Sequence, residues 1–263
     1  DSPAMAGTTG TDGMSGNGAA GDGNMTYRTN SVNGDKVSIL GYGCMRWPMI
    51  KDADGKDIID QETTDRLVDY AIGHGVNYFD TAPVYLQGQS EAATGRSLKR
   101  YPRESYYIAT KLSNFSNSSK ENSIEMYRNS LKNLQTDYID YYLLHSLSGI
   151  EAFNTRFGDT GIMDFLQEER KAGRIRNLGF SFHGDVKTFD YALSLHDQYK
   201  WDFVQIQLNY VDWRHAGSRN VNIGVGCAVA VSYCSCNVGL AVGVGYRVRF
   251  VVNETAYVVG ASL

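Results

Sequence analysis

Residues 75–85 read GVNYFDTAPVY, a short apolar run that ends in a carboxylate and is followed by a tyrosine. Residues 61–74 before it carry apolar side chains at helical spacing, and Gly75 is typical of a helix end. We therefore predict a helix over 61–74 and a strand over 76–82. A short apolar strand next to an amphipathic helix is typical of a parallel sheet covered by helices.

The same alternation extends on both sides of this stretch. Before it, Asn33-Gly34 predicts the turn of a hairpin over residues 25–38, and residues 37–44 form a predicted strand. After it, apolar runs predict strands at 106–112, 138–145, 175–183 and 203–210, with helices at 90–99, 120–134, 162–172 and 185–196. The repeat is about 30 residues long, which is the length of a strand–helix unit. An open doubly wound sheet and a closed (β/α)₈ barrel both fit this pattern.

The loop after the first predicted strand favours the barrel. A doubly wound dinucleotide-binding sheet carries Gly-x-Gly-x-x-Gly at this point. Here Gly41-Tyr42-Gly43 is followed by Cys44-Met45-Arg46, so the third glycine is missing. We therefore predict an α/β fold of the (β/α)₈ TIM-barrel type, which is incomplete because only about six βα units are recognisable.

Composition divides the chain into three regions. Residues 1–24 contain no Lys, Arg or aromatic residue and are predicted to be a flexible leader. Residues 25–219 are predicted to form the barrel. Residues 220–263 form an atypical tail rich in Val, Gly and Cys, and this abrupt change predicts a truncation or a shifted reading frame after about residue 222. The tail can supply replacement strands without covering helices, at residues 228–233, 240–252 and 256–259.

Charge and residue usage exclude several classes of function. The chain has 25 Lys and Arg against 29 Asp and Glu, so no basic field exists to hold nucleic acid. The uncharged run at 220–246 is long enough to span a bilayer, but polar and small residues interrupt it, and we predict no membrane span. The Cys and His spacing predicts neither a disulfide framework nor a metal site. Oligomeric state has no signature in the sequence.

The chain starts at Asp1, which leaves its compartment open between two alternatives. We predict a cytoplasmic protein. The alternative is an exported or periplasmic protein whose signal has been removed, because a polar leader is also typical of a tether after a cleaved signal.

Four side chains follow the predicted strands at the end where barrels carry their chemistry. They are Asp80, Tyr85, Lys111 and His145. An ammonium beside a phenol lowers the pKa of the phenol, and a carboxylate fixes the ammonium in place. Such a tyrosine can donate a proton to a carbonyl oxygen as hydride reaches the carbon, while a neutral histidine hydrogen-bonds the same oxygen. The set predicts reduction of a small-molecule aldehyde or ketone.

Several motifs over residues 36–219 resemble those of the aldo-keto reductase family. They are Gly75-x-Asn77-x-Phe79-Asp80-Thr81-Ala82-x-x-Tyr85, Gly88-x-Ser90-Glu91, Ile108-Ala109-Thr110-Lys111, Asp140-Tyr141-Tyr142-Leu143-Leu144-His145 and Gly179-Phe180-Ser181. The resemblance implies an NAD(P)H-dependent reductase with Asp80, Tyr85, Lys111 and His145 as its catalytic tetrad. It implies NADPH as the cofactor, with NADH as the alternative. Residues 41–48 resemble the bacterial branch of the family, which often carries a C-terminal iron–sulfur module.

The resemblance also implies a set of cofactor contacts. They are Gly43, Cys44 and Met45 after the first strand, and Ser181 and Gln205 near the nicotinamide carboxamide. The asparagine that usually follows the serine in this family is Phe182 here. The cysteines at 227, 234 and 236 do not match the Cys-x-x-Cys-x-x-Cys of an iron–sulfur module.

Nothing after residue 222 resembles the family's seventh and eighth strands, which normally hold the cofactor phosphates and the aromatic that stacks on the nicotinamide. Two other functions therefore stay open beside the reductase. One is a non-catalytic nucleotide-binding barrel that regulates or scaffolds a partner, and the other is a defective truncated reductase. The tetrad favours the enzyme, because a scaffold does not need it.

Overall fold

Eight strands form a closed ring at the centre of the computed structural model. The structure describes residues 25–30, 33–208, 229–234, 237–242, 247–253 and 256–262. Six strands of the ring run parallel to their neighbours: β3 (Gly41–Gly43), β6 (Tyr78–Asp80), β7 (Tyr107–Leu112), β8 (Ile139–Leu147), β9 (Ile175–Phe182) and β10 (Phe203–Leu208). The helices between them are α1 (Gln61–Gly73), α2 (Ser90–Leu98), α3 (Lys120–Leu134), α4 (Ile150–Phe153), α5 (Ile162–Lys171), α6 (Val186–Ser194) and α7 (His196–Tyr199). This alternation confirms the incomplete (β/α)₈ barrel.

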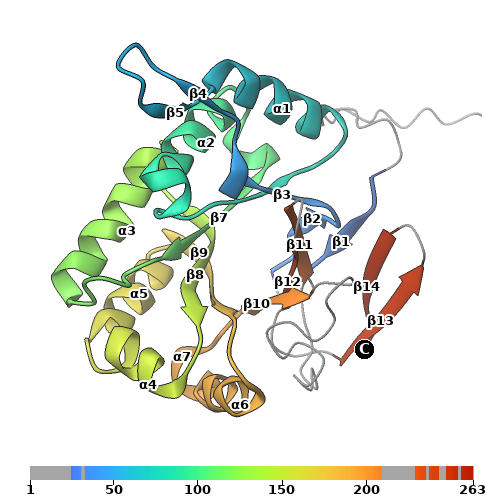
Figure 1. Cartoon of the computed structure of the whole chain (residues 1–263). Coiled ribbons are helices and arrows are strands. Elements are labelled where there is room, and N and C mark those ends of the chain that lie inside the picture. The colour runs from blue at the N-terminus through green and yellow to red at the C-terminus, as the bar shows by residue number, and fades with distance from the viewer. Residues whose placement is uncertain are drawn as a thin grey trace, which may run out of the picture.

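The tail completes the ring with two strands of different direction. The strand β12 (Asn237–Val242) pairs antiparallel with β10, and β11 (Val229–Cys234) pairs antiparallel with β12 and parallel with β3. The predicted strand at 240–252 is wrong in extent, because it is split between β12 and β13 (Arg247–Asn253). The latter forms a separate two-stranded sheet with β14 (Ala256–Ser262). In Figure 1 the described α-helices lie beside the parallel strands of the ring.

The helices bury an apolar layer against the outer face of the parallel strands. Leu166 of α5, Leu178 of β9 and Trp201 before β10 are almost fully buried in it. Inside the ring, the Tyr141 ring makes edge contacts with Tyr78 at 5.3 Å and Phe203 at 5.2 Å. The barrel interior is thus a packed aromatic core, as barrels of this size require.

Several predicted elements differ from the structure, and β6 is shorter than the strand predicted at 76–82. The apolar run at 37–44 is two strands in different sheets, because Ser38 donates to the Leu40 carbonyl at 2.7 Å and bends the chain between β2 (Lys36–Ser38) and β3. The hairpin of β4 (Met49–Lys51) and β5 (Asp57–Ile59) was not predicted. The strand β8 continues two residues beyond His145. By contrast, the predicted N-terminal hairpin is confirmed, since β1 (Tyr27–Thr29) pairs antiparallel with β2.

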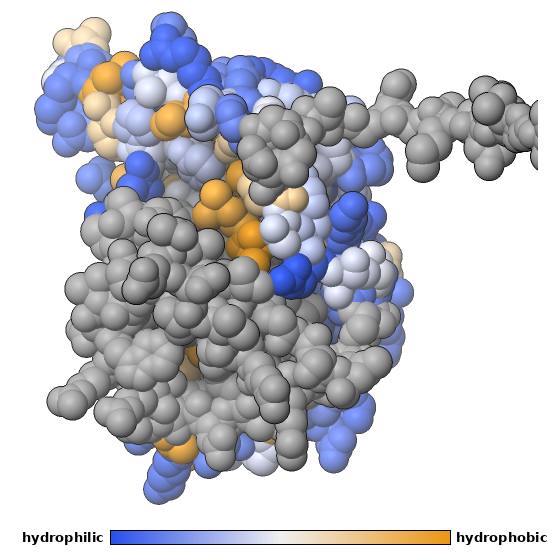
Figure 2. Space-filling view, turned by 90° about the vertical axis from the view of Figure 1, so that its right-hand side faces the viewer, coloured by the Kyte–Doolittle hydropathy of each residue, from blue (hydrophilic) through white to orange (hydrophobic). Residues whose placement is uncertain are grey.

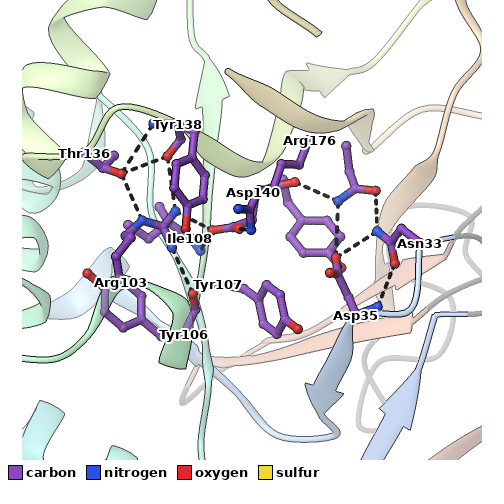
Figure 3. Close-up of polar contacts among 12 residues, drawn as sticks. Asn33, Asp35, Arg103, Tyr106, Tyr107, Ile108, Thr136, Tyr138, Asp140 and Arg176 are labelled. Carbon is purple, nitrogen blue, oxygen red and sulfur yellow. Dashed lines mark hydrogen bonds and ion pairs between the residues drawn. The ribbon is translucent and has the colours of Figure 1, made fainter. Parts of the chain in front are cut away.

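A polar network closes the end of the barrel where the parallel strands begin (Figure 3). The buried Asp140 carboxylate accepts hydrogen bonds from Arg103 at 2.5 Å, from Arg176 at 3.0 Å and from the Ile108 N–H at 2.9 Å. Both guanidinium groups stack on the Tyr138 ring, at 3.9 and 3.8 Å. Burial raises the pKa of Asp140, and the charge of Arg103 opposes this.

The N-terminal hairpin is tied to the same end of the barrel. Asp35 accepts a hydrogen bond from the Tyr141 hydroxyl at 2.8 Å, and Asn33 donates to Asn177 at 2.9 Å. Polar groups at this end of a (β/α)₈ barrel serve stability. The network lies at the end where the parallel strands begin. The predicted tetrad lies at the opposite end, where barrels of this type carry their active sites.

On the face shown in Figure 2, the described surface is mainly hydrophilic. Hydrophobic side chains form only small groups on this face. The large exposed apolar side chains among the described residues are Leu40, Ile50, Tyr70, Val84 and Phe115. In the part of the chain that the structure describes, we find no helix with the length and apolarity needed to cross a bilayer. The predicted leader at 1–24 and the cysteines at 227 and 236 lie outside the described residues.

Candidate active site

A buried ion pair joins the ends of two neighbouring strands. Asp80 ends β6, and Lys111 is the penultimate residue of β7. The Lys111 ammonium donates to the Asp80 Oδ1 at 2.6 Å and to the Thr81 carbonyl at 2.7 Å. Burial by itself would lower the pKa of Lys111, but the negative charge of Asp80 and the hydrogen bond to its carboxylate hold that pKa above its usual range. Lys111 is therefore a buried permanent cation.

Tyr85 stands next to this cation. It begins the short helix η2 (Tyr85–Gly88), and its ring centre lies 4.9 Å from the Lys111 ammonium. The three residues after it have positive φ angles of 51°, 58° and 87°, which turn the chain sharply behind the tyrosine. Burial raises the pKa of Tyr85, and Lys111 lowers it by less, so the net pKa lies above 10.0. Lys111 lowers the pKa of Tyr85 as predicted, but burial raises that pKa by more. The phenol therefore stays protonated at neutral pH.

His145 faces the tyrosine as a neutral ring. The two rings meet edge to face with centres 5.9 Å apart, and the Nδ1 of His145 lies 2.5 Å from the Ser113 hydroxyl. Burial lowers the pKa of His145 to about 2, and the charges of Lys111 and Arg156 add to this effect. When Ser113 donates to Nδ1, the imidazole proton is on Nε2 and can be donated to a ligand.

The neutral state of His145 predicts a pH dependence of stability. Unfolding restores a pKa near 6.5, so the unfolded chain binds more protons below that pH, and this contribution to stability falls as pH decreases. Between about pH 7.5 and about pH 5 the loss is about 2 kcal/mol. We expect His145→Gln to lose less stability than the parent over this range, by that amount. Urea unfolding at both pH values measures the difference, and parallel losses in the two proteins would contradict a buried neutral ring.

The predicted cofactor residues lie around the same strand ends. Ser181 and Gln205 are register partners in β9 and β10, and Gly43 is the register partner of Asp80 in β3 and β6. Ser181 accepts a hydrogen bond from the Ser146 N–H at 2.7 Å, and Gln205 donates to Asp80 at 3.3 Å.

Cys44 and Met45 begin the short helix η1 (Cys44–Arg46) directly after Gly43. Met45 is half-buried, whereas Cys44 is fully buried. The Cys44 sulfur lies 3.7 Å from the Tyr42 carbonyl, and burial raises the pKa of its thiol far above the usual range. The Cys44 carbonyl accepts a hydrogen bond from the buried Ser90 hydroxyl at 2.7 Å, so both its side chain and its carbonyl are engaged inside the protein.

Three neighbours of His145 were not predicted from the sequence. Ser113 lies just beyond Lys111, where β7 ends, so its position in the chain was a usable signal. Phe115 packs on the His145 ring at 5.2 Å, and Arg156 lies under Phe115 with its Cζ 4.3 Å from that ring centre. Arg156 belongs to the π-helix η4 (Asn154–Gly158), a segment for which the sequence pattern predicts no element.

Comparison with known proteins identifies the family of the chain. A sequence model of the Aldo/keto reductase family matches residues 40–222, and the match ends where the composition changes. The chain is 32% identical to the aldo-keto reductase YhdN of Bacillus subtilis over 130 residues, which are 46% of this chain and 38% of that protein. It is 35% identical to the NADH-specific methylglyoxal reductase of Escherichia coli over 122 residues, which are 40% of this chain and 36% of that protein. The chain thus spans less than half the length of these curated relatives.

Solved structures of the same kind are similar in fold. A putative aldo-keto reductase from Pseudomonas aeruginosa matches with a TM-score of 0.56 and 26% identity, over 74% of this chain and 71% of that chain. The holo form of the aldo-keto reductase AKR11C1 from Bacillus halodurans matches with a TM-score of 0.51 and 25% identity, over 69% of this chain and 65% of that chain. Since the family match covers most of the described barrel, the chain belongs to the aldo/keto reductase family.

Proposed function

We propose that this protein reduces aldehydes or ketones with a reduced nicotinamide cofactor, using Asp80, Tyr85, Lys111 and His145. One observation carries the proposal. A protonated phenol, a permanently charged ammonium and a neutral imidazole meet at one end of the barrel. A protonated phenol can donate its proton to a carbonyl oxygen, the ammonium stabilises the phenolate that remains, and the neutral imidazole can donate a hydrogen bond to the same oxygen.

The four side chains have separate roles in the proposed reaction. Tyr85 donates its proton to the carbonyl oxygen, and Lys111 stabilises the phenolate that remains. Asp80 holds Lys111 in place through the 2.6 Å contact and balances its charge. His145 donates a hydrogen bond from Nε2 to the same carbonyl oxygen and orients it. A bound nicotinamide supplies the hydride.

The residues present fit the nicotinamide end of such a cofactor. A carboxamide group needs both a donor and an acceptor, and the Ser181 hydroxyl and the Gln205 amide sit side by side on β9 and β10. The main chain at Gly43, Cys44 and Met45 lies at the end of β3 beside Asp80. We propose NADPH as the cofactor, and since the E. coli relative is named for NADH, both nucleotides belong in the test. We propose a cytoplasmic location for the reaction.

Titration of the purified chain with NADPH and with NADH tests this function. We expect saturable quenching of tryptophan fluorescence, followed by cofactor oxidation when a panel of aldehydes and ketones is added. Binding without turnover of any carbonyl compound would favour the non-catalytic nucleotide-binding barrel. Absence of binding by a monodisperse, cooperatively unfolding protein would contradict the proposed function.

A further inference from the structure

Arg156 is a buried cation without an acidic partner among the described residues. Its side chain is only 9% exposed and lies between the rings of Phe115 and Phe157, at 4.3 and 4.6 Å. Its Nε donates to the Asn114 Oδ1 and its Nη1 to the Ser146 carbonyl, both at 3.3 Å. Its Nη2 is buried and has no hydrogen-bond partner.

Other arginines of the barrel have the acidic partner that Arg156 lacks. Carboxylates pair with Arg100, Arg103, Arg170, Arg174 and Arg176. A buried guanidinium with an unused donor is destabilising unless an acceptor completes it, and an anionic acceptor also balances its charge. Burial lowers the pKa of Arg156 to about 10, so the group is still charged at neutral pH.

Arg156 lies within reach of the proposed carbonyl site. The Phe115 ring contacts both groups, with its centre 4.3 Å from the Arg156 Cζ and 5.2 Å from the His145 ring centre. The guanidinium is therefore no farther than about 9.5 Å from the imidazole, the sum of these two distances. Ser146, whose carbonyl accepts from Arg156, directly follows His145 in β8. A small molecule can span this separation.

Phe115 is the residue that separates Arg156 from a ligand at His145. Its side chain is 49% exposed although it covers a charged group. An exposed aromatic side chain changes rotamer within nanoseconds and needs little repacking to do so. Rotation of this one ring would uncover the guanidinium on the side of the site, where its N–H groups could meet a ligand.

We propose that Arg156 binds the carboxylate of an aldehyde or ketone whose carbonyl oxygen lies against Tyr85 and His145, with Phe115 as a movable cover. The substrate class is then a short oxo acid, and this assignment rests on the proposed reductase function. A single guanidinium balances one negative charge, which a carboxylate supplies and a phosphate dianion exceeds. The planar fork of an arginine also matches the two oxygens of a carboxylate.

Matched substrates test the assignment. Parent and Arg156→Met are compared on 4-oxobutanoate and on butanal, which share a four-carbon chain but differ in the carboxylate. The ratio of kcat/KM for the acid to that for the neutral aldehyde is expected to fall at least about 10-fold in the variant. Using this ratio removes any general effect of Arg156 on the loop around His145. An unchanged ratio, with both substrates slowed equally, would overturn the proposal.

Arg156→Lys is the second variant, because it keeps the charge and loses the fork. We expect it to recover part of the ratio that Arg156→Met loses. The same ratio of kcat/KM is also measured for glyceraldehyde 3-phosphate and glyceraldehyde, which differ in a phosphate group. If Arg156→Met lowers this ratio more than it lowers the ratio for 4-oxobutanoate and butanal, the site prefers a phosphate to a carboxylate. That result would overturn the assignment.

Binding of 4-hydroxybutanoate, measured by calorimetry without turnover, separates this proposal from the reductase function. We expect the affinity to fall at least about 10-fold in Arg156→Met. If no carbonyl compound is reduced but this loss is seen, the anion site stands and the reductase function fails. If reduction is seen but binding is equal in both proteins, the anion site fails and the reductase function stands.

Discussion

Tyr85→Phe is expected to lower kcat for carbonyl reduction by roughly 10³-fold, within the range that general acid catalysis contributes. The substitution removes the only atom that is proposed to give a proton to the carbonyl oxygen, while the ring stays beside Lys111 and His145. Affinity for NADPH should change by less than about threefold, because Tyr85 is not among the residues proposed to hold the cofactor. Stopped-flow single turnovers and fluorescence titration measure the two quantities separately.

Tyr70→Phe is the matched control for this substitution. Tyr70 lies on α1, its side chain is 68% exposed, and it has no part in the proposed site. We expect the control to retain full activity. Equal turnover by Tyr85→Phe and the parent would contradict the assignment of Tyr85 as the acid. Loss of nucleotide binding in Tyr85→Phe would instead show that the tyrosine shapes the cofactor site.

Gly179→Ala is expected to destabilise the barrel by about 3 kcal/mol or more. Gly179 lies on β9 and is the register partner of Phe203 on β10. A Cβ built at this position would lie 2.2 Å from the Phe203 carbonyl oxygen and 2.8 Å from carbons of its ring. The first of these neighbours is main chain, so relief requires the two strands to separate. Because domains are typically stable by about 5–15 kcal/mol, the variant should unfold at a much lower urea concentration.

Gly73→Ala provides the comparison for Gly179→Ala. Gly73 is the last residue of α1, and an added Cβ there meets no atom within 4 Å. This change should be neutral or stabilising by up to about 1 kcal/mol, because alanine has the higher helix propensity. Urea unfolding followed by tryptophan fluorescence measures both variants. An unchanged midpoint for Gly179→Ala would mean that β9 and β10 pack differently from the arrangement described.

Sequence reasoning succeeded best where a local pattern decides the structure. The helix predicted at 120–134 has the observed bounds of α3, because Ser119 caps it and apolar residues recur at helical spacing. Sequence reasoning failed where contacts between residues far apart in the chain decide the structure. The apolar run at 37–44 looks continuous but serves two sheets, and the β4–β5 hairpin has too little apolar alternation to be predicted.

The tetrad positions follow from the sequence together with one topological rule. The carboxyl ends of neighbouring parallel strands meet at one rim, so Asp80, Lys111 and His145 were expected to converge there. The structure brings Lys111 within 2.6 Å of Asp80, as this rule requires. The pairing of a strand with its neighbour is the only long-range information that this prediction needed.

What the sequence by itself determined is the order of strands and helices and the kinds of side chain at the strand ends, since both depend on local periodicity. The tertiary structure alone decided the states of those side chains. Burial outweighs Lys111 at Tyr85, and Arg156 lies under Phe115 close to His145. It also decided that β11 and β12 close the ring. The physical reason is that solvent exposure and charge environment are sums over atoms from segments far apart in the chain, which no local pattern contains.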